Sequence, residues 1–212
     1  MTAPRHAAPD PQLGQIGTRA YTDRMNAIDA RNSSLVLVDY QARLMPAIHG
    51  AADVIAKALV LARAAELLDV PIIGTEQDQA KLGPNTDALV RLCRHTVAKT
   101  HFDACEDGLL AALEAHAPSR RQVVVAGCEA HVCLLQTALG LLRAGLEVYV
   151  VENACGSRRP LDHAAAMRRL QQAGAVAVTH EMVLFEWLHD CRHPRFRDVL
   201  ALVKAQPAAG HP

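Results

Sequence analysis

Ser34-Leu-Val-Leu-Val-Asp39 is an unbroken apolar run that ends in an acid, and it decides how this chain folds. A strand with one wet face alternates apolar and polar residues, whereas a strand buried on both faces of a parallel sheet is apolar throughout. The run therefore predicts a buried strand of a parallel sheet. Asp39 then lies at the carboxyl end of that strand.

Strand-like and helix-like segments alternate along the chain from this point. Apolar residues recur at helical spacing over 51–68, and Asp69 to Thr75 reads as the next strand, which completes a βαβ unit. Further strands are expected at 95–99, 122–127, 147–152 and 175–179. Further helices are expected at 86–93, 107–116, 131–144 and 161–173, and as two helices over 181–205 that break at His193-Pro194. The alternation predicts the α/β class, as a Rossmann-like three-layer αβα sandwich with a mainly parallel six-stranded sheet.

The length of 212 residues suits one compact domain with tails. Residues 1–31 are rich in Ala, Pro and polar residues without a sustained period, so we expect an N-terminal extension that is mobile or wraps a neighbour. The folded domain is expected over 32–205, followed by a short C-terminal tail over 206–212. Neither a linker to a second domain nor an internal repeat is visible in the sequence.

Composition excludes several kinds of partner. Lys plus Arg equals Asp plus Glu at 22 each, and no basic run interleaves with aromatics, so nucleic acid is not an expected partner. The absence of a signal-peptide pattern and of a long apolar segment predicts a cytoplasmic protein without a membrane partner. Six cysteines without CxxC spacing indicate free thiols, not a disulfide framework or a zinc site. A net charge of zero favours association into a homo-oligomer.

Candidate chemical groups follow three of the expected strands. Ligands of an open parallel sheet bind outside the carboxyl ends of its strands, where Asp39, Lys99 and the helix that carries Cys133 are expected. A thiol in the first turn of a helix, beside an ammonium group, should be more acidic than usual, and a carboxylate can take its proton. Each residue also has a purely structural interpretation, as a packed thiol, a helix cap or a surface charge.

Three longer stretches carry a resemblance to a known family. They are LVLVDYQARLMPAI with Asp39, VAKTHFDAC with Lys99, and VVVAGCEAHVCLLQTALGLLRAGLEVYVVENACGSR with Cys133. Together they make the chain resemble the isochorismatase-like cysteine hydrolases over about residues 33–203, and in particular the subgroup of isochorismatase domain-containing proteins, which share its TEQ and Leu-Gly-Pro segments. The resemblance implies the isochorismatase-like hydrolase fold and a catalytic triad of Asp39, Lys99 and Cys133. It also implies a homo-oligomer that is a dimer or a higher assembly.

The resemblance also implies a cis peptide bond between Cys128 and Glu129, with the amides of Glu129 and Cys133 forming an oxyanion hole. The alternative interpretation is an ordinary strand-to-helix loop. Cys128 could itself be the nucleophile, but its place in an apolar strand run favours a packed thiol. His131 and Cys133 are two positions apart on a helix, so their side chains diverge and a Cys-His dyad is not favoured. The residues expected to line the substrate pocket are Gln41, Glu76, His101, Phe102, Ala130 and His131.

No metal or other cofactor is expected. The related nicotinamidases hold a metal through an Asp-x-His motif and a further His, whereas residues 75–84 of this chain contain no histidine. The glycines form neither a GxGxxG nor a GxxxxGK[ST] pattern, so a nucleotide cofactor is not indicated either.

These observations predict a hydrolase that acts on a small amide, carbamoyl or related carbonyl compound through a thioester-type intermediate. The bond attacked would be a C–N bond other than a peptide bond. Two alternatives stay open: a vinyl ether hydrolase of the isochorismatase kind, and a binding or scaffold protein that retains the pocket but has little turnover.

Overall fold

The computed structural model describes residues 27–205, so residues 1–26 of the N-terminal extension expected over 1–31, and the expected tail 206–212, lie outside the described residues. Six parallel strands form one sheet in the order β3-β2-β1-β4-β5-β6, which confirms the predicted α/β fold class. The strands are β1 (Ser33–Val38), β2 (Ile72–Gln77), β3 (His95–Lys99), β4 (Gln122–Gly127), β5 (Glu147–Val151) and β6 (Val176–Val178).

The strand that decides the fold lies in the middle of the sheet. All six residues of β1 are buried, and β1 pairs with β2 on one side and with β4 on the other. The chain order reverses at this point, because it runs from β1 to β3 in one direction and from β4 to β6 in the other. Loops that leave β1 and β4 therefore diverge at their carboxyl ends, and the crevice between them is where ligands of such sheets bind.

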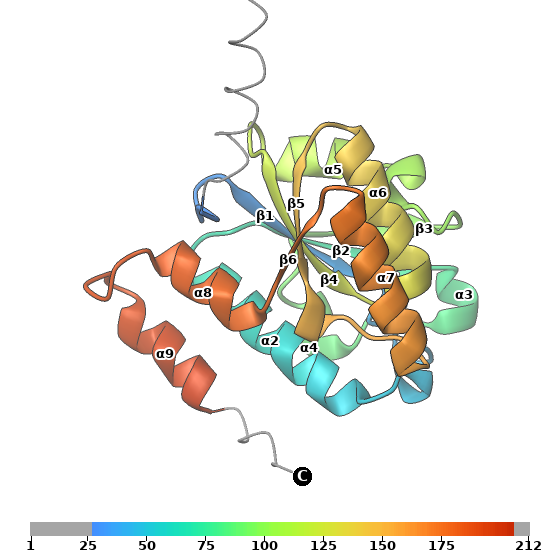
Figure 1. The fold of residues 1–212 in the computed structure, drawn as a ribbon, viewed down its shortest axis with the longest axis horizontal. Helices are drawn as coiled ribbons and strands as arrows, with labels where there is room; N and C mark the ends of the chain where they lie inside the picture. Colours follow the sequence, from blue (N-terminus) through green and yellow to red (C-terminus); the bar gives the residue numbers. More distant parts are fainter. Residues whose placement is uncertain (1–26, 206–212) are drawn as a thin grey trace, which may run out of the picture.

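Helices cover both faces of the sheet and make it the middle of three layers (Figure 1). One face carries α2 (Ala51–Leu67), which contacts α8 (His180–Leu188) and α9 (Phe196–Lys204). The other carries α5 (Leu109–His116), α6 (Leu135–Arg143) and α7 (Pro160–Gln172). Short elements complete the order: η2 (Met45–Ala47), α3 (Gln79–Leu82), α4 (Asp87–Val90), η3 (Ala104–Asp107), η4 (Ala130–Leu134) and η5 (Glu152–Ala154).

Several boundaries differ from the sequence expectation, and two of them matter for the site. The strand expected to end at Thr75 continues to Gln77, because β3 pairs with it as far as Lys99. The helix expected over 131–144 is divided into η4, a π-helical turn, and α6. The first change brings the Gln77 side chain to the sheet edge, and the second places Cys133 in a widened turn instead of a regular helix.

Ile28 is buried against this core, and its amide donates to Glu186 at 2.7 Å.

Among residues 27–205, no helix combines the length and the apolar character that a membrane crossing requires.

Candidate active site

Asp39 follows β1 directly, at the crevice. Its backbone has φ 52°, a left-handed conformation that is uncommon for non-glycine residues, although Asp adopts it more readily than most. The side chain is fully buried, and its Oδ1 accepts a hydrogen bond of 2.6 Å from Thr75 Oγ1. Lys99 Nζ lies 2.8 Å from Oδ2 as an ion pair, yet Oδ2 accepts no well-oriented hydrogen bond within the described part of the chain. One carboxylate oxygen is thus anchored and the other is available to a proton.

Lys99 ends β3 with its side chain fully buried. Besides Asp39, its ammonium group contacts Gln77 Oε1 at 2.6 Å and the His101 carbonyl oxygen at 3.3 Å. Taking two charges out of water costs several kcal/mol per ion, so a buried pair contributes little to net stability. A pair of this kind at a strand-end crevice is typical of a functional site.

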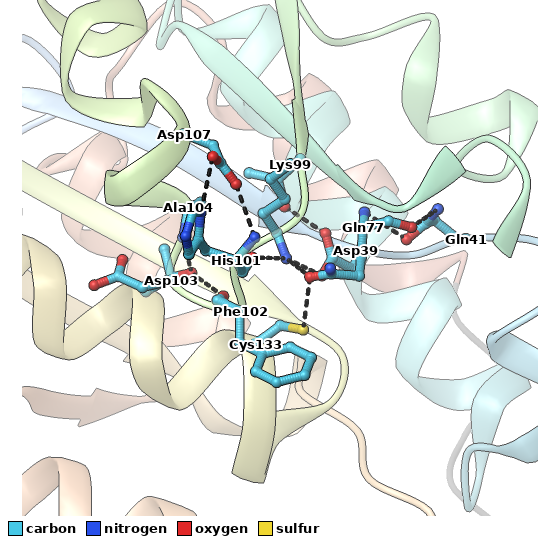
Figure 2. A network of polar contacts seen from close by, with 12 residues as sticks. Asp39, Gln41, Gln77, Lys99, His101, Phe102, Asp103, Ala104, Asp107 and Cys133 are labelled. Atoms are coloured by element: carbon cyan, nitrogen blue, oxygen red, sulfur yellow. Dashed lines mark hydrogen bonds and ion pairs between the residues drawn. The ribbon is translucent and has the colours of Figure 1, made fainter. Parts of the chain in front are cut away.

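Cys133 lies in η4 with 6% of its surface exposed, and its sulfur is 3.8 Å from Gln77 Oε1. Figure 2 shows its side chain directed at the group formed by Asp39, Gln77 and Lys99. Burial raises the pKa of the thiol to about 12, the Asp39 carboxylate adds to the rise, and Lys99 opposes it. The sequence predicted a more acidic thiol, and that expectation is wrong for the resting site, because burial and Asp39 together outweigh the ammonium group.

Gln77 and Thr75 are two residues at the site that the sequence analysis did not single out. They belong to β2, where residues i and i+2 point to the same face, so both face Asp39 and Lys99. The signal was present in the Thr-Glu-Gln segment at the end of the strand, because successive side chains of a strand point to opposite faces and Thr75 and Gln77 therefore share one face. It was missed because the strand was expected to end at Thr75.

Two of the expected pocket residues form hydrogen bonds to backbone groups with their side chains. They are Gln41 and Glu76. Gln41 is fully buried; its Nε2 donates to the carbonyls of Gln77 at 3.0 Å and Gly83 at 2.5 Å, and its Oε1 accepts from the Gln77 amide at 2.9 Å. The Glu76 carboxylate accepts from the Asn85 amide at 2.7 Å and has a second hydrogen bond on its other oxygen. Both residues therefore shape the wall of the site through the β2 end and the loop after it.

His101 and Phe102 lie in the loop after β3 and are both exposed, Phe102 by 50%. Asp107 holds this loop, since its Oδ2 accepts from the Thr100 amide at 2.7 Å and the His101 amide at 2.9 Å. Its Oδ1 lies 3.0 Å from His101 Nδ1, and this hydrogen bond raises the pKa of the imidazole. The Phe102 carbonyl accepts from Thr137 Oγ1 at 3.3 Å, which ties the loop to α6.

The turn from β4 into η4 contains the remaining expected residues. The Cys128–Glu129 peptide bond is cis, and Cys128 is fully buried. Ala130 is buried as well, and its amide donates to the Gly156 carbonyl at 2.7 Å. The His131 Nδ1 atom lies 3.0 Å from Ser157 Oγ, so this imidazole is paired with a serine.

A cavity of about 670 Å³ lies at the opposite, amino-terminal edge of the sheet, lined among others by Asp29, Asp69, Glu186 and Trp187. None of Asp39, Lys99 and Cys133 borders it, so the candidate active site is located by its side-chain geometry and not by cavity size. Within residues 27–205, no three or more His, Cys, Asp and Glu side chains are grouped so that they could hold a metal ion.

Comparison with known proteins defines the class of protein that has this fold and strand-end site. The family model described as the isochorismatase domain matches residues 33–182, and the chain therefore belongs to the isochorismatase family, whose members are generally hydrolases. Isochorismatase domain-containing protein 2A of Mus musculus is 35% identical over 176 residues, which cover 82% of this chain and 83% of that protein.

Solved structures support the same assignment. A structure described as MAR1 ribonuclease from Caenorhabditis elegans has a TM-score of 0.80 and 31% identity, and the match covers 88% of this chain and 97% of that one. The YcaC gene product of Escherichia coli, described as an octameric hydrolase of unknown specificity, shares the fold with a TM-score of 0.74 and 24% identity over 84% of this chain and 96% of its own.

Proposed function

We propose that this chain is a cysteine hydrolase that acts on a small amide, carbamoyl or related carbonyl compound, with Cys133 as nucleophile, Asp39 as general base and acid, and Lys99 as the cation between them. One observation carries the proposal. Three residues from separate segments meet at the carboxyl edge of the sheet, as a fully buried Asp39–Lys99 ion pair of 2.8 Å with a buried thiol next to it. An acid, a cation and a thiol in one buried group meet the needs of nucleophilic catalysis.

The resting thiol is neutral because its pKa is raised, so its proton must leave as the sulfur attacks. Asp39 Oδ2 is the acceptor in our proposal, since Thr75 already engages Oδ1. The Cys133 sulfur forms a bond to the carbonyl carbon while the S–H proton passes to Oδ2. Lys99 stabilises the negative charge that develops on the sulfur during this transfer.

Collapse of the tetrahedral adduct completes the first half of the reaction. The bond from carbon to the amine breaks, and the leaving nitrogen takes the proton from Asp39. A thioester on Cys133 remains, and water then attacks its carbonyl carbon while passing a proton to the same carboxylate. The second adduct collapses as its carbon–sulfur bond breaks, the sulfur takes the proton back from Asp39, and the acid product leaves the site in its resting state.

The negative oxygen of each adduct needs hydrogen-bond donors. We propose the amides of Glu129 and Cys133 for this role, because they lie at the start of η4, where a helical segment presents backbone N–H groups without intrahelical partners. Loss of one such donor typically costs about 3 kcal/mol in the transition state. Phe102, His101 and the wall formed by Gln41 and Glu76 would then surround the substrate's remaining groups.

The test is an amidase panel paired with detection of an acyl adduct by intact mass. The protein should carry Cys191→Ser, because Cys191 is an exposed thiol and would add background. We expect turnover of at least one small amide and an adduct that maps to Cys133, and we expect both to disappear in Cys133→Ala. An adduct on Cys128 or Cys155, or vinyl ether cleavage that survives Cys133→Ala, would contradict the proposal. Ligand binding without any turnover would favour the binding-protein alternative.

A further inference from the structure

The ammonium group of Lys99 has three N–H donors and three acceptors around it. It donates to Gln77 Oε1 at 2.6 Å and to the His101 carbonyl oxygen at 3.3 Å, and it forms an ion pair with Asp39 Oδ2 at 2.8 Å without a well-oriented hydrogen bond. A lysine has no further donor to offer. In the resting site, Gln77 and the His101 carbonyl therefore hold two of these N–H groups, and the contact with Gln77 is the shortest of the three.

The orientation of the Gln77 amide is determined by its partners. Its Nε2 donates to the carbonyl oxygen of Thr100 at 2.6 Å, an atom that can only accept. Its Oε1 faces Lys99, a group that can only donate. Exchanging the two amide atoms would lose both hydrogen bonds, so the oxygen must be the atom that lies 3.8 Å from Cys133 Sγ.

The backbone of Gln77 is fixed by two further hydrogen bonds. The fully buried side chain of Gln41 accepts from the Gln77 amide and donates to its carbonyl, as a neighbouring strand would. The Gln77 side chain is thus fixed at both ends, by Gln41 through the backbone and by Thr100 through the amide nitrogen. A carbonyl dipole fixed in this way keeps its negative end directed at both Lys99 and the thiol.

An acceptor oxygen beside a thiol stabilises the S–H form and disfavours the thiolate. The same oxygen occupies a lysine proton that a thiolate would otherwise use. The charged groups that act on this thiol are Asp39 and Lys99, and Gln77 lies against both the lysine and the sulfur. Its removal should therefore make the thiol more acidic, and a negative charge in its place should have the opposite effect.

We propose that Gln77 is a positioning residue that keeps the resting site in its neutral-thiol form by occupying Lys99 with its amide oxygen, until the transfer of the thiol proton to Asp39 releases the lysine toward the sulfur. This inference rests on the proposed function, because it assigns Gln77 a role in preparing the Cys133 nucleophile. In this role Gln77 acts through Lys99 and the thiol and forms no bond to the substrate.

The test uses the full chain with Cys191→Ser and measures the alkylation rate of Cys133 against pH by mass mapping. Below the pKa of a thiol the rate rises about tenfold per pH unit, so a shift of about one unit appears as about a tenfold change at any pH in that range. Gln77→Met removes the acceptor at similar length, and we expect faster alkylation by about that factor. Gln77→Glu places a carboxylate there, and we expect alkylation slower by a similar factor.

Gln79→Met is the matched control. Gln79 is the next glutamine along the chain, and its side-chain amide donates to Glu76 Oε2 at 2.9 Å. This hydrogen bond involves neither Lys99 nor Cys133. The alkylation rate of Cys133 in the Gln79→Met variant should stay within about twofold of the rate in the parent. Circular dichroism and a cooperative melt for each variant establish that the fold is kept; if Gln77→Met does not fold, Gln77→Asn, which draws the oxygen back by one methylene, should also accelerate the reaction.

Opposite changes in Gln77→Met and Gln77→Glu support the inference, because a residue that only supported the fold would change both rates in the same direction. Rates that change in the same direction, or that match Gln79→Met, overturn it. The proposed function fails in a different way. If the parent protein is labelled at Cys128 or Cys155 in preference to Cys133, the nucleophile is wrong whatever the Gln77 variants do.

Discussion

Asp39 and Lys99 form a fully buried ion pair. We expect substitution of Asp39 to lower turnover and substitution of Lys99 to lower stability. Asp39→Asn keeps the shape of the side chain but cannot accept a proton. We expect turnover to fall by about 10²–10⁴-fold, the usual loss for a general acid or base. Steady-state kinetics on the first substrate found in the panel measures this change. Turnover within a few-fold of the parent would contradict the role of Asp39.

Lys99→Met, by contrast, leaves a carboxylate buried without its counter-ion. Breaking a buried pair in this way costs about 3–5 kcal/mol, and urea unfolding should show a loss of this size. The double variant Asp39→Asn with Lys99→Met should recover much of that stability, because it has no unpaired charge. If the single variant is as stable as the parent, the pair is not buried in solution as it is here.

At the scale of elements, the loop after β3 depends on Asp107, which holds two backbone amides and the His101 imidazole. Because this hydrogen bond raises the pKa of His101, the imidazole stays protonated to a higher pH than a free histidine. Asp107→Asn removes the charge, and we expect the His101 pKa to fall toward its ordinary value, as an NMR titration of the imidazole would show. An unchanged titration midpoint would mean that the loop does not hold His101 against Asp107.

The contact between β1 and β4 requires glycine at position 127, where a Cβ atom would collide with the Val38 backbone. Forcing extra volume into such a site typically costs about 1–3 kcal/mol. Gly127→Ala should lose stability in this range on urea unfolding. Gly74→Ala is the comparison, because its Cβ would meet the Cys93 Sγ and Thr96 Oγ1 atoms at 3.1 Å, and side-chain ends can shift. An equal loss in both variants would contradict the backbone collision.

At the scale of the whole molecule, we predict that the chain forms a homo-oligomer. The net charge of zero gives little repulsion between copies, which favours association. Sedimentation velocity should find a species of dimer mass or larger at micromolar concentration. A single species of monomer mass over that range would contradict the prediction.

Strand and helix order could be predicted from the sequence because it depends on local pattern. The apolar run before Asp39 predicts a buried parallel strand from its own residues alone, and the alternation of strand-like and helix-like segments predicts the three layers. The positions of Asp39, Lys99 and Cys133 near the ends of strands followed from the same pattern. Boundaries were less certain, since the last residues of β2 are strand only because β3 pairs with them.

The protonation state of the site depended on the tertiary structure. Helix position and a nearby lysine suggested an acidic thiol, but the pKa of Cys133 is raised, because burial and the position of Asp39 are properties of the packed chain. The role of Gln77 depends likewise on which acceptor is 2.6 Å from the Lys99 ammonium group, and no sequence spacing reports that distance. Sequence by itself determined the order of the elements and the candidate residues, because hydrophobic period is local. Only the tertiary structure decided how these residues share protons, because burial and hydrogen-bond partners come from segments far apart in the chain.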